Sequence, residues 1–214
     1  MHIPDGLLQP EVIATTAVLS AVTVSVAVKK SGEQLDDSTI PMVGIMSAFL
    51  FIAQMIQFPV GPGISGHMLG GALMAILAGP WIASIVLTTV LLIQCIVFQD
   101  GGLLALGANI LNMAVIGVFS GYLMYSFMRK LIPGAKYRPL AISAAAFVSV
   151  ILPSAAAGYQ LGISGVVPLL PGMIMITSIH VLIGIGEAVI TVFAVTFIEK
   201  SMPDVVRLRV KQTQ

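Results

Sequence analysis

The sequence predicts an all-α membrane protein, a polytopic bundle of about seven transmembrane helices in which residues 1–214 form a single transmembrane domain. Hydrophobic residues make up 57% of the chain and charged residues only 9%, whereas a soluble domain carries about 25% charged residues. Apolar runs such as residues 82–97 do not alternate polar and apolar positions, as the strands of a transmembrane β-barrel do. So few charges cannot cover a surface in water, and we therefore expect a lipid bilayer around the chain.

Seven apolar segments are long enough, or nearly so, to cross the bilayer core, which takes about 20 helical residues. The third segment is short, and the Gly79-Pro80 turn separates it from the fourth. Without this turn, residues 69–97 would form one overlong helix. The predicted spans are Leu7 to Val28, Pro41 to Gln57, Gly66 to Ala78, Pro80 to Phe98, Leu103 to Phe127, Leu140 to Tyr159 and Leu169 to Ile198.

The basic residues predict the orientation, because Lys and Arg gather on the cytoplasmic side of a membrane. With seven spans and the N-terminus outside, all ten Lys and Arg fall in inner segments, and an even number of spans would break this sorting. We therefore expect an N-terminus outside, a cytoplasmic C-terminus, and binding chemistry at the outer face of the cell inner (plasma) membrane. The basic residues are Lys29, Lys30, Arg129, Lys130, Lys136, Arg138, Lys200, Arg207, Arg209 and Lys211.

Several function classes find no support in the sequence. It contains no HExxH, GxSxG or Walker A motif, so we expect neither an enzyme nor ATP hydrolysis by this chain. No basic patch indicates nucleic-acid binding. Cys95 stands alone in an apolar run and is expected to be a small buried hydrophobe. The opening residues lack the basic region of a secretory signal, so the mature protein is expected to start at Met1.

The opening dipeptide Met1-His2 could chelate a transition metal. A free α-amine, the His2 amide nitrogen and its imidazole Nδ1 can bind one ion together, through a five-membered and a six-membered ring. The three nitrogens lie in one plane and leave a single in-plane position open. Planar nitrogen ligation is typical of Ni(II) or Cu(II), with Co(II) a relative, whereas Mg(II) and Ca(II) prefer oxygen. The alternative is that His2 is an incidental residue at a frayed terminus.

A second histidine, His67, lies in a segment rich in glycine and proline, residues 58–70, at the outer end of the third predicted span. No acidic residue or cysteine lies near it in the sequence, so it cannot build a metal site alone. It could supply the fourth nitrogen, with residues 58–66 closing over the ion, provided that their backbone is buried in protein or faces a cavity. The alternative is a helix-capping or core histidine.

Four further polar residues could support such a site from outside the ligand set. Asp100 could accept a hydrogen bond from a metal-bound imidazole, or belong only to a turn. Asn109 and Asn112 are three residues apart and therefore neighbours on a helix, where they serve the site or the packing of helices. Asp5 could fix the turn after Pro4 and so aim the terminus into the bundle.

His180 and Glu187, in the last predicted span, support a rival function. They are seven residues apart and lie close to one helix face, and ionisable groups inside a membrane are functional candidates. Together they could form the proton relay of an ion-coupled secondary transporter. A hydrogen-bonded core residue is the alternative for His180, and a non-transporting scaffold is a third possibility for the whole chain.

Three stretches together resemble the CbiM/NikM family: residues 1–6 (MHIPDG), 65–71 (SGHMLGG) and 99–109 (QDGGLLALGAN). These proteins are the substrate-specific (S) membrane components of energy-coupling factor (ECF) transporters for nickel and cobalt. The resemblance covers the whole chain in length and order, and the first stretch is specific because it must stand at residue 1.

The resemblance implies a site in which the Met1 amine, the His2 amide and imidazole, and the His67 imidazole hold Ni(II) or Co(II) as substrate, with no other cofactor. It also implies a transmembrane coupling (T) subunit and paired cytoplasmic ATPases as partners, often with a small additional membrane subunit. The expected function is therefore high-affinity capture of Ni(II) or Co(II) from the outer side for an ATP-driven importer, by a domain that comprises residues 1–214.

Overall fold

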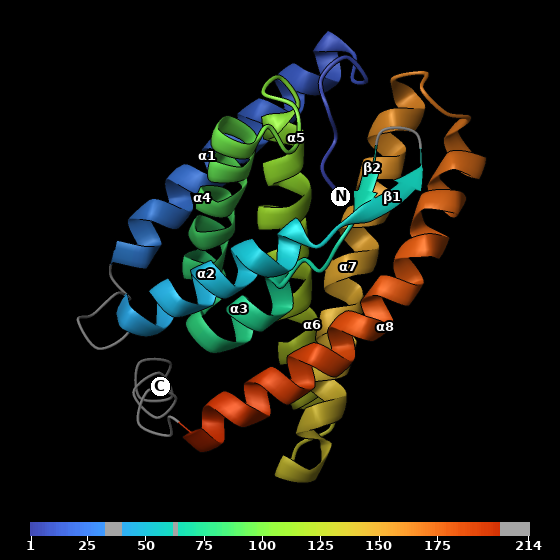
Figure 1. The fold of residues 1–214 in the computed structure, drawn as a ribbon. Coiled ribbons are helices and arrows are strands. Elements are labelled where there is room, and N and C mark those ends of the chain that lie inside the picture. The colour runs from blue at the N-terminus through green and yellow to red at the C-terminus, as the bar shows by residue number, and fades with distance from the viewer. Residues whose placement is uncertain (33–39, 62–63, 202–214) are drawn as a thin grey trace.

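The computed structural model describes residues 1–32, 40–61 and 64–201 as a helical bundle with one small hairpin (Figure 1). Residues 106–131 form one continuous helical run, and its middle part, residues 110–117, is a π-helix. The elements are α1 (Pro10–Gly32), α2 (Ile40–Met55), β1 (Phe58–Gly61), β2 (Ile64–Gly66), α3 (Gly71–Ala78), α4 (Pro80–Phe98), α5 (Leu106–Asn109), η1 (Ile110–Gly117), α6 (Val118–Leu131), η2 (Ala135–Tyr137), α7 (Arg138–Ile163) and α8 (Leu169–Ser201).

Five helical runs in the described part of the chain are long and apolar enough to cross a membrane: α1, α4, α5 to α6, η2 to α7, and α8. A multi-pass membrane protein is therefore confirmed. The second predicted span corresponds to α2, with 16 residues, and the third to α3, with only 8. At about 1.5 Å per residue, α3 covers less than half of a bilayer core of about 30 Å. The number of seven spans and the orientation of the termini stay predictions.

The expected break between α3 and α4 is present. Gly79 adopts a φ of 90°, outside the helical region, and its N–H still bonds to the carbonyl of Ala75. Pro80 then takes the first position of α4, where its missing N–H costs no helical hydrogen bond. The turn reverses the chain so that α3 packs beside α4 and brings the segment that precedes α3 into the middle of the bundle.

A prediction of helices alone misses the hairpin formed by β1 and β2, which pair antiparallel with Phe58 opposite Gly66. Residues 58–66 were expected to be a loop. In β2, the buried Ile64 and Gly66 flank the less buried Ser65, which is the alternation expected of a strand. The hairpin lies beside the N-terminal segment in Figure 1 and leads directly into the stretch that carries His67.

The basic residues in the described part of the chain lie at the end of the bundle opposite the N-terminal segment and the hairpin. Lys30, in the last turn of α1, places its ammonium 4.5 Å from the ring centre of Trp81. Arg138, at the start of α7, pairs with Glu199 near the end of α8 and donates to the Tyr125 hydroxyl. This clustering fits the predicted inner face. Three of the basic residues behind that prediction, Arg207, Arg209 and Lys211, lie outside the described residues.

Candidate metal site

The N-terminal segment lies inside the protein instead of fraying into solvent. Figure 1 shows it passing between α5 and the hairpin toward the centre of the bundle. Met1 and Ile3 are 0% exposed and His2 is 4% exposed. The buried side chain of Asn109 holds this segment at both backbone groups of Ile3, accepting from its N–H at 2.8 Å and donating to its carbonyl at 3.0 Å.

The connection after α4, residues 99–105, forms the second support of the N-terminal segment. Gly102 donates its N–H to the Ile3 carbonyl at 2.9 Å. Asp5 accepts from the backbone N–H groups of residues 103, 104 and 105 at 2.9, 2.8 and 3.1 Å. A side chain on Gly102 would overlap the Asp5 carboxylate and backbone nitrogen, so the close approach requires glycine. Asp5 therefore ties the N-terminal segment to this connection, whereas the sequence predicted only that it fixes the turn after Pro4.

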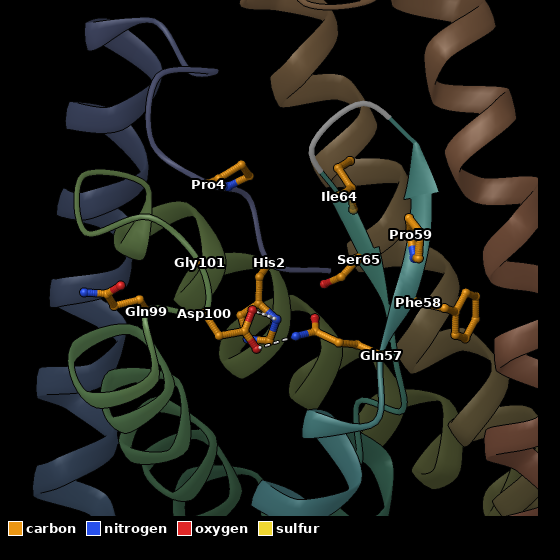
Figure 2. Close-up of a pocket in the computed structure, with 10 residues that line it drawn as sticks. All are labelled: His2, Pro4, Gln57, Phe58, Pro59, Ile64, Ser65, Gln99, Asp100 and Gly101. Carbon is orange, nitrogen blue, oxygen red and sulfur yellow. Dashed lines mark hydrogen bonds and ion pairs between the residues drawn. The ribbon is translucent and has the colours of Figure 1, made fainter.

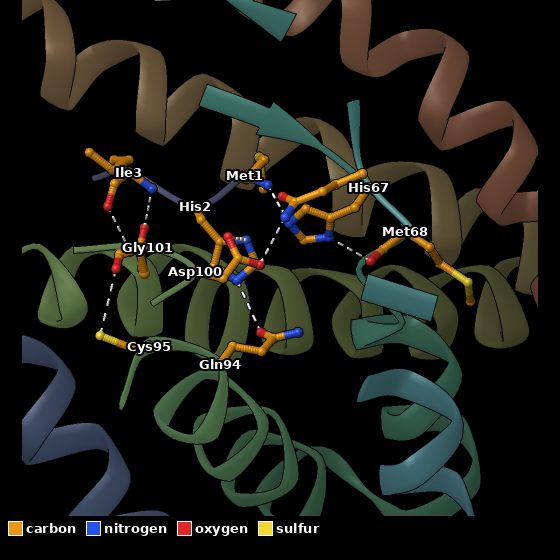
Figure 3. A network of polar contacts seen from close by, with 11 residues as sticks. Met1, His2, Ile3, His67, Met68, Gln94, Cys95, Asp100 and Gly101 are labelled. Carbon is orange, nitrogen blue, oxygen red and sulfur yellow. Dashed lines mark hydrogen bonds and ion pairs between the residues drawn. The ribbon is translucent and has the colours of Figure 1, made fainter. Parts of the chain in front are cut away.

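The α-amine of Met1 and the Nε2 of His67 are hydrogen-bonded across 66 residues of sequence. His67 is 1% exposed, and its Nδ1 lies 2.8 Å from the carbonyl oxygen of Met68. A carbonyl only accepts hydrogen bonds, so Nδ1 carries the ring proton and Nε2 presents a lone pair toward Met1. The contact therefore brings one potential ligand nitrogen of Met1 next to one of His67 (Figure 3).

His2 presents a second lone pair at the same place. Its Nε2 lies 3.0 Å from the side-chain oxygen of Gln94, so Nε2 carries the proton and Nδ1 is free. The buried Nδ1 has no hydrogen-bond partner among the described residues. Asp100 approaches it at 3.6 Å, too far for a hydrogen bond. The His2 and His67 rings stack with centroids 4.7 Å apart.

The surroundings favour the neutral forms of the Met1 amine and the His2 imidazole. Burial lowers the pKa of the Met1 amine well below its usual value, with the Asp100 carboxylate opposing the shift. Burial, and to a lesser degree the neighbouring amine, lowers the pKa of His2 to about 3. Burial also raises the pKa of Asp100, against the hydrogen bond from Gln57. Both pKa shifts at the terminus therefore favour the neutral forms, whose lone pairs can bind a cation.

A pocket with a volume of about 450 Å³ leads to this cluster. Figure 2 shows His2 and Asp100 facing each other in it, with Gln57 and Ser65 beside them. Asp100 accepts a hydrogen bond from Gln57 at 3.2 Å, and the buried hydroxyl of Ser65 has no partner in the described part of the chain. The pocket is lined by His2, Pro4, Gln57, Phe58, Pro59, Ile64, Ser65, Gln99, Asp100 and Gly101.

Among residues 1–32, 40–61 and 64–201, no group of three or more His, Cys, Asp or Glu side chains could hold a metal ion. A metal site here therefore depends on backbone nitrogens. The structure brings together the candidate ligands Met1, His2 and His67 and sets Asp100 beside them. Asn112 does not join this cluster.

The two asparagines thus have separate roles. Asn109 bonds to Ile3, whereas Asn112 exchanges two hydrogen bonds with Gln160 of α7, each 2.8 Å long. Both sit where α5 passes into the π-helical segment η1. The wider helical turn there changes the direction of successive side chains, which the three-residue spacing did not anticipate.

Glu187 and His180 do not form a relay with each other. The two carboxylate oxygens of Glu187 accept the N–H groups of Leu69 and Gly70 at 2.6 and 2.8 Å. His180 bonds through Nδ1 to the carbonyl of Ile176, one turn back, at 2.8 Å, which fits the interpretation as a hydrogen-bonded core residue. Its Nε2 has no partner among the described residues.

Sequence reasoning missed the amide side chains that set this geometry. Gln94 fixes the proton position on His2, and Gln54 donates to the Leu69 carbonyl at 2.8 Å from the far side of the His67 segment. Both are 0% exposed. The available signal was their presence inside apolar helices, since buried amides need partners. That signal does not reveal which partner each one has.

Residues 2–205 match the family model described as CbiM, the cobalt uptake substrate-specific transmembrane region. A provisionally named fused nickel transport protein NikMN of Archaeoglobus fulgidus is 36% identical over 96% of this chain and 68% of its own length. The cobalt transport protein CbiM of Geobacter sulfurreducens is 30% identical over 95% of this chain and 61% of its own length.

A solved structure has the same fold. The crystal structure of a truncated transition metal transporter superposes with a TM-score of 0.87 at 33% sequence identity. The superposition covers 94% of this chain and 99% of that one, so it includes the helical bundle as a whole.

Proposed function

Because the chain belongs to the CbiM family, the cobalt uptake substrate-specific transmembrane region, we propose that it captures Ni(II) or Co(II) from the outer side of the cell inner membrane. In this proposal it is the high-affinity substrate-binding component of an ATP-driven ECF importer. A transmembrane coupling subunit and paired cytoplasmic ATPases would supply the energy, because the chain has no Walker A motif of its own. A small additional membrane subunit would complete the assembly.

One observation carries the proposal: the buried Met1 amine meets the Nε2 of His67, next to the unpartnered Nδ1 of His2. A buried nitrogen without a partner costs free energy, and a bound cation would remove that cost. The hydrogen bonds from the other ring nitrogens to Gln94 and Met68 are the kind of support that metal-bound histidines use.

The ligand set follows from these nitrogens. The Met1 amine, the His2 amide and the His2 Nδ1 would form the chelate, and the His67 Nε2 would complete the plane. The His2 amide N–H makes no hydrogen bond to a described residue, so no existing bond opposes loss of its proton. A compact plane of four nitrogens favours Ni(II) and related ions over Mg(II) and Ca(II), which need oxygen ligands.

Nickel titration of the purified protein tests this proposal. A tag of several residues placed ahead of Met1 removes the α-amine and does not fit a terminus that is 0% exposed. The same tag at the C-terminus is the matched control. We expect one nickel ion per chain with the C-terminal tag, and loss of that binding with the N-terminal tag. Full affinity with the N-terminal tag would contradict the proposed ligand set.

Uptake into vesicles separates the proposal from the ion-coupled transporter. That rival requires Glu187 to exchange protons, but both of its oxygens accept backbone hydrogen bonds. We expect metal uptake only with the coupling subunit, the ATPases and ATP. Uptake by this chain alone, driven by an ion gradient, would support the rival instead.

A further inference from the structure

We propose that Glu187 is a positioning residue of the metal site, which holds the segment carrying His67 so that the fourth nitrogen is in place before the ion arrives. The inference rests on the proposed function, since it concerns the same site. Glu187 lies on α8, is 1% exposed, and takes no part in the chelation itself.

The carboxylate makes a two-pronged contact with the backbone. Its Oε2 accepts the N–H of Leu69 at 2.6 Å and its Oε1 accepts the N–H of Gly70 at 2.8 Å. These groups lie immediately before α3, where N–H groups lack helical partners and the helix dipole favours a negative charge. Two buried hydrogen bonds from adjacent backbone groups to one side chain make this contact a firm anchor for the stretch.

The same stretch is held from the opposite side by α2. The buried Gln54 amide donates to the Leu69 carbonyl at 2.8 Å. Gly70 has a φ of 75°, and a side chain there would overlap that of Leu50. The backbone of residues 69–70 is therefore fixed by hydrogen bonds with α8 and α2 and by its close packing against the Leu50 side chain.

The position of His67 depends on this anchor. Its Nδ1 donates to the carbonyl of Met68, the residue next to the anchored pair, so the ring plane follows the backbone at that point. Figure 3 shows the His67 ring set between this carbonyl and Met1. The other ligands come from the N-terminal segment, which Asn109 holds independently. Thus the two halves of the site have separate supports, and Glu187 supports only the half with His67.

The test compares Glu187→Gln with wild type in equilibrium nickel binding and in the visible absorption of the bound ion. Gln keeps the shape but loses the charge, and it sets an NH2 group against one of the two N–H donors. We expect about a tenfold to hundredfold loss of affinity, the range for residues that orient a metal ligand. Water would replace the His67 nitrogen in part of the bound protein, which weakens the ligand field and moves the absorption to longer wavelength.

Glu199→Gln is the matched control, because it removes a carboxylate from the last turn of the same helix, away from the His67 segment. It should leave affinity and absorption unchanged. If Glu187→Gln does not fold, Gln54→Met removes the opposite support of Leu69 and should shift the absorption in the same direction.

Three results would overturn the inference while leaving the proposed function intact. The first is nickel binding by Glu187→Gln within about twofold of wild type. The second is reduced affinity with an unshifted absorption at saturating nickel, which would assign Glu187 to stability alone. The third applies if that variant does not fold, and is an unchanged spectrum for Gln54→Met. Absence of nickel binding by the wild type would instead refute the proposed function.

Discussion

The substitution Asn109→Ala should weaken the docking of the N-terminal segment and so lower metal affinity more than it lowers the stability of the fold. The Asn109 side chain makes two buried hydrogen bonds to the backbone of Ile3. At about 1 kcal/mol net for each bond, their loss removes about 2 kcal/mol. The Ile3 carbonyl keeps its bond from Gly102, but the Ile3 N–H is left buried without a partner, so this sum is a lower estimate.

This energy should appear mainly in metal affinity, because it holds Met1 and His2 over His67. A change of about 2 kcal/mol corresponds to about a 30-fold loss, since 1.4 kcal/mol is tenfold. Competition titration with a nickel chelator at fixed pH measures the loss, and thermal unfolding without metal measures stability.

The chain offers a close control in Asn112→Ala. Asn112 also makes two buried hydrogen bonds, to Gln160, from the next turn of the same helical run, but it makes no hydrogen bond to residues 1–3. Its replacement should lower the melting temperature of the metal-free protein and change nickel affinity by less than about threefold. Equal losses of affinity in the two variants, or an unchanged affinity in Asn109→Ala, would refute a local role for Asn109.

Three further predictions concern protons and packing. Burial lowers the pKa of His2 to about 3 and also lowers the pKa of the Met1 amine, so both shifts favour neutral nitrogens and we expect only the His2 amide to lose a proton on binding. Nickel binding at pH 7 should therefore release about one proton, and affinity should rise about tenfold per pH unit. Calorimetry in buffers of different ionisation enthalpy counts the released protons, and a count of two or more would contradict this expectation. Gln94→Met removes the partner of the His2 Nε2 proton, so the proton can move to Nδ1, and nickel affinity in the same titration should fall by about tenfold or more. Gly102→Ala places a methyl group against Asp5 and should lower the free energy of unfolding by about 1–3 kcal/mol in chemical denaturation, whereas Gly44→Ala, with open space around it, should not.

The helical architecture could be predicted because it depends on local properties of the chain. Long apolar runs indicate helices directly, and Gly79-Pro80 marks a break that the structure contains. The hairpin of residues 58–66 was missed because its glycines and prolines also suit a loop, and the pairing of Phe58 with Gly66 becomes visible only in three dimensions. Chain length alone did not distinguish a short helix inside the bundle, such as α3, from a span.

The candidate ligands were predicted from chelate geometry at Met1-His2 and from the resemblance carried by the segment around His67. The residues that support them were assigned less well, because these contacts join positions far apart in sequence. Gln94 reaches His2 across 92 residues and Asn109 reaches Ile3 across 106. A polar residue in an apolar helix predicts that some partner exists, but its identity depends on how the helices pack.

The burial of the first residues also orders the steps by which the protein assembles. The N-terminal segment contacts His67, Gln94 and Asn109. Shortly after it, Gln9 donates its N–H to the Ser164 hydroxyl at 3.1 Å. The N-terminal segment can therefore dock only after most of the later helices have entered the bilayer. Contacts of such long sequence separation form late and slowly in folding. Any enzyme that trims or modifies the terminus has access only during this interval, and maturation of the α-amine and insertion of the helices therefore compete in time.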